Sequence, residues 1–236
     1  MMNNNKIITI SGLSACGKTT LLGKLRDRYG AFLVPSSSSL RDKNKNFQDI
    51  SDSLEDNIVK QKYYFELDKR VSSIAQNAKN EGKLVFCDRD FLSALAHNYA
   101  VHQQFPETSV YPWMIKAYSK ALQHKELIIP DLHIFLDVSL NERIRRKQSD
   151  PERIRDNCFF DPIFSRNMET FYKGALQTIP SLWVDFNMDT TTEHIFSAVE
   201  KIQEQKTIKV ENLINFIKDT MHDRRIDTYF RENHSR

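Results

Sequence analysis

The sequence predicts a three-layer α/β fold, in which a five-stranded parallel sheet is covered by helices on both faces. Five short runs are almost continuously apolar rather than alternating, as is typical of parallel strands buried on both sides. Segments with helical spacing of apolar residues separate these runs, and strands that alternate with helices indicate a parallel sheet. A glycine-rich turn joins the first strand to the first helix.

The strands and helices follow one another in a regular order along the chain. Pro35 and Asp88 end the second and third strands, and Pro130 and Pro180 precede the fourth and fifth. Strands are predicted at 6–10, 31–34, 83–87, 132–137 and 182–185, and helices at roughly 19–29, 54–80, 91–104, 110–124, 140–148, 158–176 and 191–205.

Three polar segments interrupt this alternation. Residues 36–52 are serine-rich and are expected to form a mobile loop, and residues 148–157 form a charged break around Pro151. The tail beyond residue 205 has apolar residues at helical spacing between 210 and 217. We therefore expect one domain over 1–205 and a helical extension over 206–236.

Composition and charge are those of an ordinary globular chain. The 236 residues suffice for one large core, and a formal net charge of +3 argues neither for nor against a nucleic-acid partner. Cys16, Cys87 and Cys158 lack the spacing of a metal or redox site, which fits a reducing cytosol. No signal peptide or membrane-length apolar run is found, so we expect a soluble cytoplasmic protein without a membrane partner.

The glycine-rich turn carries the strongest functional signal. It completes the pattern G-x-x-x-x-G-K-[ST] between a buried strand and a helix, the context that a phosphate-binding loop requires. Backbone N–H groups would converge on phosphate oxygens, Lys18 would reach the β- and γ-phosphates, and the Thr19 hydroxyl would ligate Mg²⁺. The sequence therefore predicts nucleoside triphosphate binding. The predicted loop comprises Gly12, Leu13, Ser14, Ala15, Cys16, Gly17, Lys18, Thr19 and Thr20.

The third predicted strand ends in an acid and a base. Ligands of parallel α/β sheets bind beyond the carboxyl ends of the strands, so Asp88 and Arg89 are expected to share a crevice with the loop. Asp88 is suited to hold Mg²⁺ through water or to act as a base on a hydroxyl, and Arg89 offers a planar charged fork to a phosphate. A strand-end salt bridge is the alternative. Asp137, at the end of the fourth strand, is interpreted as structural rather than as a metal ligand.

Several segments together resemble thymidylate kinases. Residues 12–20 look like that family's loop G-L-x-x-x-G-K-[ST]-T, and residues 88–97 resemble its D-R-x-x-x-S-x-x-A-Y stretch. Residues 65–70 are similar to its F-x-x-[DN]-R segment, and residues 130–139 to its P-D-x-x-x-x-L-D-V-[ST] strand. The resemblance covers about residues 6–205. It implies a P-loop kinase fold, ATP and Mg²⁺ as cofactors, a nucleotide or nucleoside acceptor, and a possible homodimer.

The resemblance also implies which residues contact the acceptor. The ring of Phe65 would stack on a base, Lys69 stands where the family has a base-reading arginine, and Arg70 is adjacent. Arg89 would bind the acceptor phosphate and Ser93 would touch the acceptor. A simple core position for Phe65 and a solvent-facing position for Ser93 are the alternatives.

The basic segment after the fourth strand, about 146–157, is interpreted as a lid that closes over ATP. The phosphate loop contains no arginine, so the lid would deliver one to the transferred phosphate. Arg153 is the first candidate for this catalytic cation and Arg146 the second, alongside Lys18, Asp88 and Arg89. The alternative is a solvated helix in which Glu142 and Arg146 form an ordinary i,i+4 pair.

The acceptor side departs from the family pattern. No acid stands in the phosphate loop or after the second strand, where the residues are Ser14 and Ser36, and His97 replaces a tyrosine. A hydroxyl acceptor normally needs a carboxylate base, so the missing acid favours a phosphorylated acceptor. We therefore expect ATP-dependent phosphoryl transfer to a nucleoside monophosphate, with a nucleoside or nucleoside-like metabolite as the alternative.

A non-catalytic nucleotide-binding switch or nucleic-acid-binding protein is the alternative of a different class. Arginines in the tail beyond residue 222 motivate it. Acidic residues in the same stretch offset their charge, so packing or dimerisation is the simpler explanation of the tail, and a nucleic-acid partner is not expected.

Overall fold

The computed structural model describes residues 5–42, 53–148, 158–185, 188–201 and 209–221. Five parallel strands form one sheet in the order β2-β3-β1-β4-β5, so the predicted fold class is confirmed. Every residue of β1 is buried, because helices cover both sides of the central strands. The strands are β1 (Ile7–Gly12), β2 (Phe32–Val34), β3 (Val85–Asp88), β4 (Leu132–Asp137) and β5 (Ser181–Asp185).

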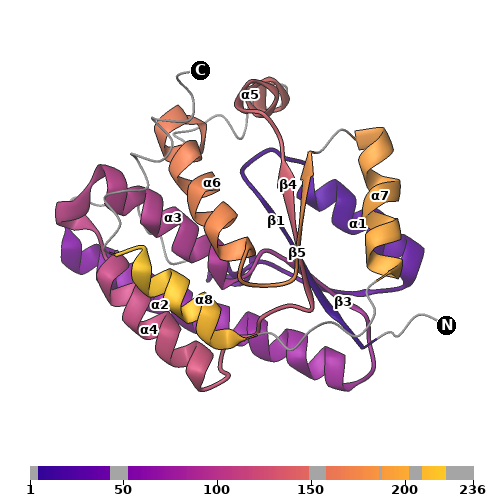
Figure 1. The fold of residues 1–236 in the computed structure, drawn as a ribbon, viewed down its shortest axis with the longest axis horizontal. Helices are drawn as coiled ribbons and strands as arrows, with labels where there is room; N and C mark the ends of the chain where they lie inside the picture. The colour runs from indigo at the N-terminus through magenta and orange to yellow at the C-terminus, as the bar shows by residue number, and fades with distance from the viewer. Residues whose placement is uncertain (1–4, 43–52, 149–157, 186–187, 202–208, 222–236) are drawn as a thin grey trace.

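Helices cover the two faces of the sheet unequally (Figure 1). On one face lie α1 and α7, and on the other lie α2, α3 and α6, with α4 and α8 forming a further layer outside them. The α-helices are α1 (Lys18–Tyr29), α2 (Leu54–Asn80), α3 (Phe91–Gln104), α4 (Tyr111–Gln123), α5 (Leu140–Gln148), α6 (Pro162–Leu176), α7 (Met188–Glu200) and α8 (Val210–Asp219).

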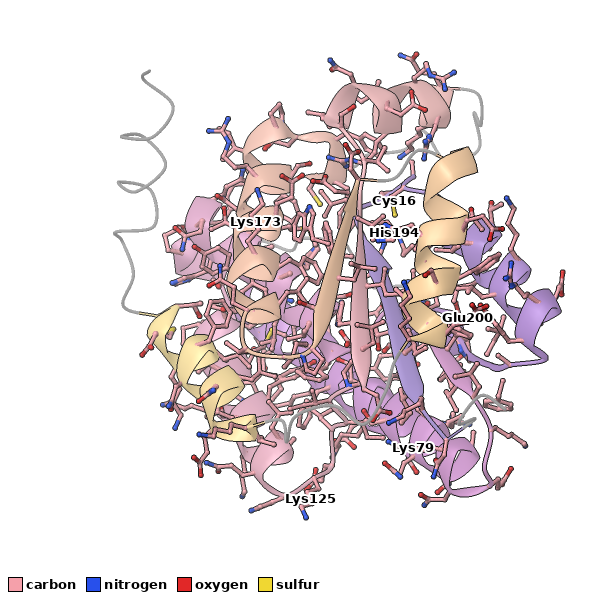
Figure 2. The ribbon with its side chains drawn as sticks, turned by 45° about the vertical axis from the view of Figure 1, so that its right-hand side comes forward. Cys16, Lys79, Lys125, Lys173, His194 and Glu200 are labelled. Carbon is pink, nitrogen blue, oxygen red and sulfur yellow. The ribbon has the colours of Figure 1, made fainter. Side chains whose placement is uncertain are left out.

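Polar contacts hold α1 and α7 together on their face. The hydroxyl of Tyr29 donates to the Glu200 carboxylate at 3.0 Å, and Arg28 forms an ion pair with the same carboxylate at 3.3 Å. Glu200 lies at the end of α7 that faces α1 (Figure 2). These contacts join α1, which directly follows the phosphate loop, to α7.

Two predicted segments differ in detail from the structure. The helix expected over 158–176 divides into a 3-10 turn, η4 (Cys158–Phe160), and α6. The break occurs because the Asp161 carboxylate accepts from the Phe164 N–H at 2.7 Å and caps α6, with Pro162 at its first position. The serine-rich segment contains a second 3-10 turn, η1 (Ser37–Leu40), and its residues 43–52 lie outside the described ranges.

The helix predicted in the C-terminal extension packs on the preceding helices of the fold. The Phe216 ring of α8 lies 5.4 Å from that of Phe171 in α6, and the hydroxyls of Tyr111 and Thr220 are 2.7 Å apart. Helix α8 thus lies beside α4 in the outer helical layer and packs against α6. Among the described helices, none has the length and apolar character needed to span a membrane.

Candidate active site

The phosphate loop turns sharply where β1 ends. Gly12 has φ +148°, and a Cβ at this position would lie 2.7 Å from both Cys16 Sγ and the Leu136 carbonyl oxygen. Gly17, with φ +96°, directly precedes α1. Both positions therefore require glycine, and the loop delivers the N-terminus of α1 to the carboxyl end of the sheet.

Lys18 is held inside the loop that carries it. Its ammonium group donates to the carbonyl oxygens of Gly12 and Leu13, both at 3.0 Å, and to Cys16 Sγ at 3.3 Å. Burial and, second, repulsion from Arg89 lower the pKa of Lys18 to about 8. The charge of Arg89 therefore acts at the phosphate loop, as the sequence predicts for two parts of one site.

Asp88 and Thr19 fit a Mg²⁺ site. Asp88 ends β3 opposite Ile10 of β1, and its charge acts to raise the pKa of Lys18. Within the described ranges, Asp88 Oδ1 is buried and has no hydrogen-bond partner, whereas Thr19 is exposed in the first turn of α1. One carboxylate and one hydroxyl suit Mg²⁺, which takes most of its other ligands from water and phosphate oxygens.

Arg89 has a constrained backbone and borders a cavity. Its φ is +69°, a left-handed conformation uncommon outside glycine, and its N–H donates to the Ile10 carbonyl oxygen at 3.0 Å. In the part of the chain that the structure describes, Arg89 forms no ion pair with a carboxylate. The alternative of a strand-end salt bridge is therefore not seen, and the guanidinium group borders a cavity instead.

Helix α5 brings Arg146 to the phosphate loop. Arg146 Nη1 donates to the Cys16 carbonyl oxygen at 3.2 Å, and Nε donates to Glu142 at 2.7 Å. Figure 1 shows α5 beyond the carboxyl ends of β4 and β5, and Figure 2 shows Cys16 near the same end of the sheet. Arg146 thus forms both the i,i+4 pair with Glu142 and the contact with the phosphate loop. Arg153 lies outside the described residues.

Arg89 borders a cavity of about 340 Å³. It is bounded by α2, by the start of α3, by the corner after β2, and by η4 and α6. Its lining residues are Ser36, Ser37, Ser38, Lys60, Gln61, Tyr64, Asp68, Arg89, Asp90, Ser93, Ala94, His97, Asn98, Phe159 and Met168.

Two of the five predicted acceptor residues border this cavity. Arg89 and Ser93 do so, and the Ser93 hydroxyl is 2.7 Å from that of Tyr172. Phe65, Lys69 and Arg70 are not among the lining residues.

The other three predicted acceptor residues have different neighbours. The Phe65 ring packs edge-on against the ring of Tyr118 at 4.9 Å, which is the core position given above as its alternative. Lys69 pairs with Glu66 at 2.8 Å, and Arg70 is exposed. These residues lie on faces of α2 that turn away from the cavity, and they take no part in the acceptor contacts proposed below.

Sequence reasoning missed the face of α2 that does border the cavity. Lys60, Gln61, Tyr64 and Asp68 recur at helical spacing and project from neighbouring turns of α2. Gln61 and Asp68 are 6 % and 4 % exposed, which is unusual for such side chains. Polar residues at i, i+3 and i+7 of a long helix were the available signal.

Two carboxylates enter the cavity from α2 and α3. Asp68 Oδ1 accepts from the Ser37 hydroxyl, and Oδ2 accepts from the Tyr118 hydroxyl at 2.7 Å. Burial raises the pKa of Asp68 to about 6. Asp90 caps α3 by accepting from the Leu92 N–H at 3.0 Å.

His97 contributes an uncharged ring to the cavity. Burial, with smaller contributions from the charges of Lys60 and Arg89, lowers its pKa to about 3. The ring packs 5.6 Å from Phe159 and 5.3 Å from Phe164. His97 is therefore neutral at physiological pH and adds shape rather than charge.

A buried arginine anchors the wall formed by η4. Arg143 of α5 has no exposed surface, and it donates to the carbonyl oxygens of Val138 and Phe159 and to the Ser165 hydroxyl. Asp137 accepts from Trp183 Nε1 at 2.9 Å. Arg143 thus links the helix that carries Arg146 to Phe159, a residue that borders the cavity.

Comparison with known proteins shows which family the chain resembles. A sequence profile of the deoxynucleoside kinase family matches residues 8–221. A probable thymidylate kinase of Methanococcus maripaludis strain S2 is 29 % identical over 214 residues, which are 89 % of this chain and 99 % of the relative. A probable thymidylate kinase of strain C6 is 23 % identical over the same coverage.

Solved structures show the same fold. Deoxyadenosine kinase from M. mycoides with bound dATP superposes with a TM-score of 0.63 at 22 % identity, covering 82 % of this chain and 98 % of that one. Thymidylate kinase from Candida albicans gives a TM-score of 0.59 at 19 % identity, covering 87 % and 97 %. Together with the profile match, the sheet and the phosphate loop confirm the predicted recognition of a P-loop phosphotransferase: the chain is a member of the deoxynucleoside kinase family.

Proposed function

We propose that this kinase transfers the γ-phosphoryl group of ATP to a hydroxyl group of a nucleoside. The charge balance of the cavity is the observation that carries this proposal. Among the lining residues that the structure describes, Lys60 and Arg89 oppose Asp68 and Asp90, and His97 is neutral. A nucleoside adds no charge to this lining, whereas a monophosphate adds between one and two negative charges at neutral pH.

ATP occupies the phosphate loop in this proposal. The amides of residues 12–20 surround its phosphates, and Lys18 exchanges its carbonyl partners for phosphate oxygens. Arg146, already bound to the Cys16 carbonyl oxygen, supplies a second positive charge from α5, and Arg153 belongs to the same proposed lid. Thr19 and Asp88 would hold Mg²⁺, which neutralises charge on the β- and γ-phosphates when bound.

The acceptor occupies the cavity beside Arg89. Phosphoryl transfer requires alignment of the acceptor and positive charge around the transferred group, more than covalent participation by the protein. As the acceptor oxygen bonds to the γ-phosphorus and ADP leaves, the hydroxyl proton would pass to Asp88, the carboxylate at the end of β3. Arg89 borders the cavity, and its charge also acts on Lys18, so it connects the acceptor site to the donor site. Ser93 is a further proposed contact of the acceptor.

A nucleoside monophosphate is the second candidate acceptor. The corner after β2 presents only hydroxyl groups to the cavity, from Ser36, Ser37 and Ser38, and an already ionised phosphate needs no strong base. Arg89 would then bind the acceptor phosphate. The curated relatives are named probable thymidylate kinases, which is consistent with this candidate.

Release of ADP across nucleosides and nucleoside monophosphates tests the proposal. We expect turnover of at least one nucleoside, and loss of nearly all turnover in Lys18→Ala with the fold retained by circular dichroism. Lys24→Ala, an exposed lysine on the same helix, is the matched control and retains activity. Turnover of monophosphates alone would establish the second candidate, and nucleotide binding with no turnover would favour a non-catalytic switch.

A further inference from the structure

The wall of the cavity formed by α2 contains a buried carboxylate that the phosphoryl transfer described above does not use. Asp68 is 4 % exposed and lies two helical turns, about 10 Å, along α2 from Gln61. In the described residues it forms no ion pair with lysine or arginine. Such a carboxylate must be stabilised by hydrogen-bond donors.

The two donors around Asp68 do not fill all of its acceptor positions, so a ligand can donate further hydrogen bonds to it. Ser37 donates to one oxygen and Tyr118 to the other. An ionised carboxylate has about four acceptor positions, so each oxygen retains capacity for a further donor. The neighbouring Asp90 carries only acceptor oxygens and adds negative charge nearby. A group that donates a hydrogen bond is therefore favoured here, and a carbonyl oxygen is repelled.

The base and the sugar of a nucleoside present different groups to such a carboxylate. Amino-substituted bases, such as cytosine and adenine, present N–H donors where uracil and hypoxanthine present a carbonyl oxygen. The hydroxyl groups of the sugar are common to all of these nucleosides, so they do not discriminate among them. Discrimination at Asp68 thus depends on the exocyclic group of the base.

We propose that Asp68 is a specificity-determining residue that selects acceptors whose base carries an exocyclic amino group, by accepting a hydrogen bond from that group. The inference rests on the proposed function only in placing the acceptor in this cavity, and it applies to a nucleoside and to a monophosphate alike. Ser37 and Tyr118 position the carboxylate, because each donates to one of its oxygens.

Matched nucleoside pairs provide the test. Deoxycytidine and deoxyuridine differ in an amino or oxo group and in the hydrogen on the adjacent ring nitrogen, as do deoxyadenosine and deoxyinosine. Affinities measured by calorimetry on the full-length protein should favour the amino member of the bound pair by about 10- to 100-fold, the range for a hydrogen bond to a charged group. This measurement needs no turnover.

Two variants assign the preference to the carboxylate. In Asp68→Asn the side chain gains a donor for the carbonyl oxygen, so the preference falls to less than about threefold or reverses. Glu66→Gln, an exposed acid on the same helix, retains the wild-type preference.

The outcomes separate this inference from the proposed function. Equal affinity for both members of each pair in the wild-type protein, or binding of neither pair, overturns the role of Asp68. Equal kcat/KM for both members overturns it as well, while establishing the kinase activity. An amino preference that Asp68→Asn removes supports the inference, even if no ADP is released and the proposed transfer to a nucleoside is rejected.

Discussion

At the scale of single residues, Gly12 sets the path of the phosphate loop. Its φ is +148°, and a side chain there would place its Cβ 2.7 Å from both Cys16 Sγ and the Leu136 carbonyl oxygen, which leaves no room for it. Since the Leu136 oxygen belongs to the backbone of β4, it cannot move aside without disturbing the sheet. The close approach of β4 to the loop therefore depends on this glycine.

We predict that Gly12→Ala lowers the free energy of unfolding by at least about 2 kcal/mol, because the backbone conformation and the contact are both unfavourable. Urea denaturation measures this change. Gly23→Ala is the matched control: this position lies inside α1 with open space around it, so alanine there should stabilise the protein by about 0.5–1 kcal/mol. A comparable loss in both variants would contradict the argument.

Asp68 couples stability to pH. Its pKa rises from 3.8 to about 6 on folding, chiefly through burial, so the folded state binds more protons than the unfolded state between these values. Stability therefore falls as the pH rises through this window. The ionised carboxylate costs roughly 3 kcal/mol at neutral pH relative to a carboxyl group that ionises normally.

We predict that Asp68→Asn removes this pH dependence, since an amide does not titrate. The difference in unfolding free energy between pH 4 and pH 7 should shift by roughly 2–3 kcal/mol in favour of pH 7 relative to wild type. Denaturation at a series of pH values gives the comparison. Glu66→Gln, an exposed position, should follow the wild-type curve; identical curves for all three proteins would refute the assignment.

At the scale of elements, α5 and η4 act as one unit. Arg143 donates to Val138 before α5, to Phe159 in η4 and to Ser165 in α6. The same helix places Arg146 on the phosphate loop. Three neighbouring segments are thus joined by one buried guanidinium group, between the donor site and the cavity.

We predict that Arg143→Met lowers the free energy of unfolding by about 3 kcal/mol, because buried oxygens of Val138 and Phe159 lose their donors. The displaced Phe159 should also raise KM for the acceptor several-fold. Steady-state kinetics and urea denaturation measure the two effects. Arg145→Met is the control, because Arg145 is 73 % exposed and pairs only with Glu142 among the described residues. If that variant loses as much, the buried contacts are not responsible.

At the scale of the whole molecule, the parts predicted from sequence are those governed by local pattern. Apolar strands, helical periodicity and the spacing of the loop glycines depend on neighbouring residues, and the five-stranded sheet and the loop follow from them. Strand direction alone places Asp88 and Arg89 at the same end of the sheet as the phosphate loop. These features needed no knowledge of tertiary packing.

The residues that line the acceptor cavity could not be predicted from the sequence, because no local pattern shows how the helices pack. Phe65 and Tyr64 are adjacent on α2. The orientation of α2 about its axis, set by its packing against α3 and α4, decides which of the two side chains borders the cavity. Asp68 is an ordinary helical acid until the fold buries it beside Ser37 and Tyr118. Resemblance to one family selects residues by their place in a motif, whereas the rotation of the helix decides which of them border the cavity.

Ligand binding should stabilise the assembled molecule as a unit. The loop, β3 and α5 contribute Lys18, Asp88 and Arg146 from separate parts of the chain, so a nucleotide that contacts all three joins them. At a hundredfold excess over its Kd, a ligand that binds only the folded state adds about 2.7 kcal/mol. For a chain of this length the gain corresponds to a rise in Tm of roughly 5–10 °C.

We predict this rise with ATP and Mg²⁺ together, and a smaller one when EDTA removes the metal, because Asp88 and the phosphates then repel each other. Differential scanning fluorimetry measures it. Lys18→Ala should lose the nucleotide-induced rise, whereas Lys24→Ala, exposed on the same helix, should keep it. An equal rise in both variants would show that ATP binds away from the loop; an EDTA-insensitive rise would show that Thr19 and Asp88 hold no metal with the nucleotide.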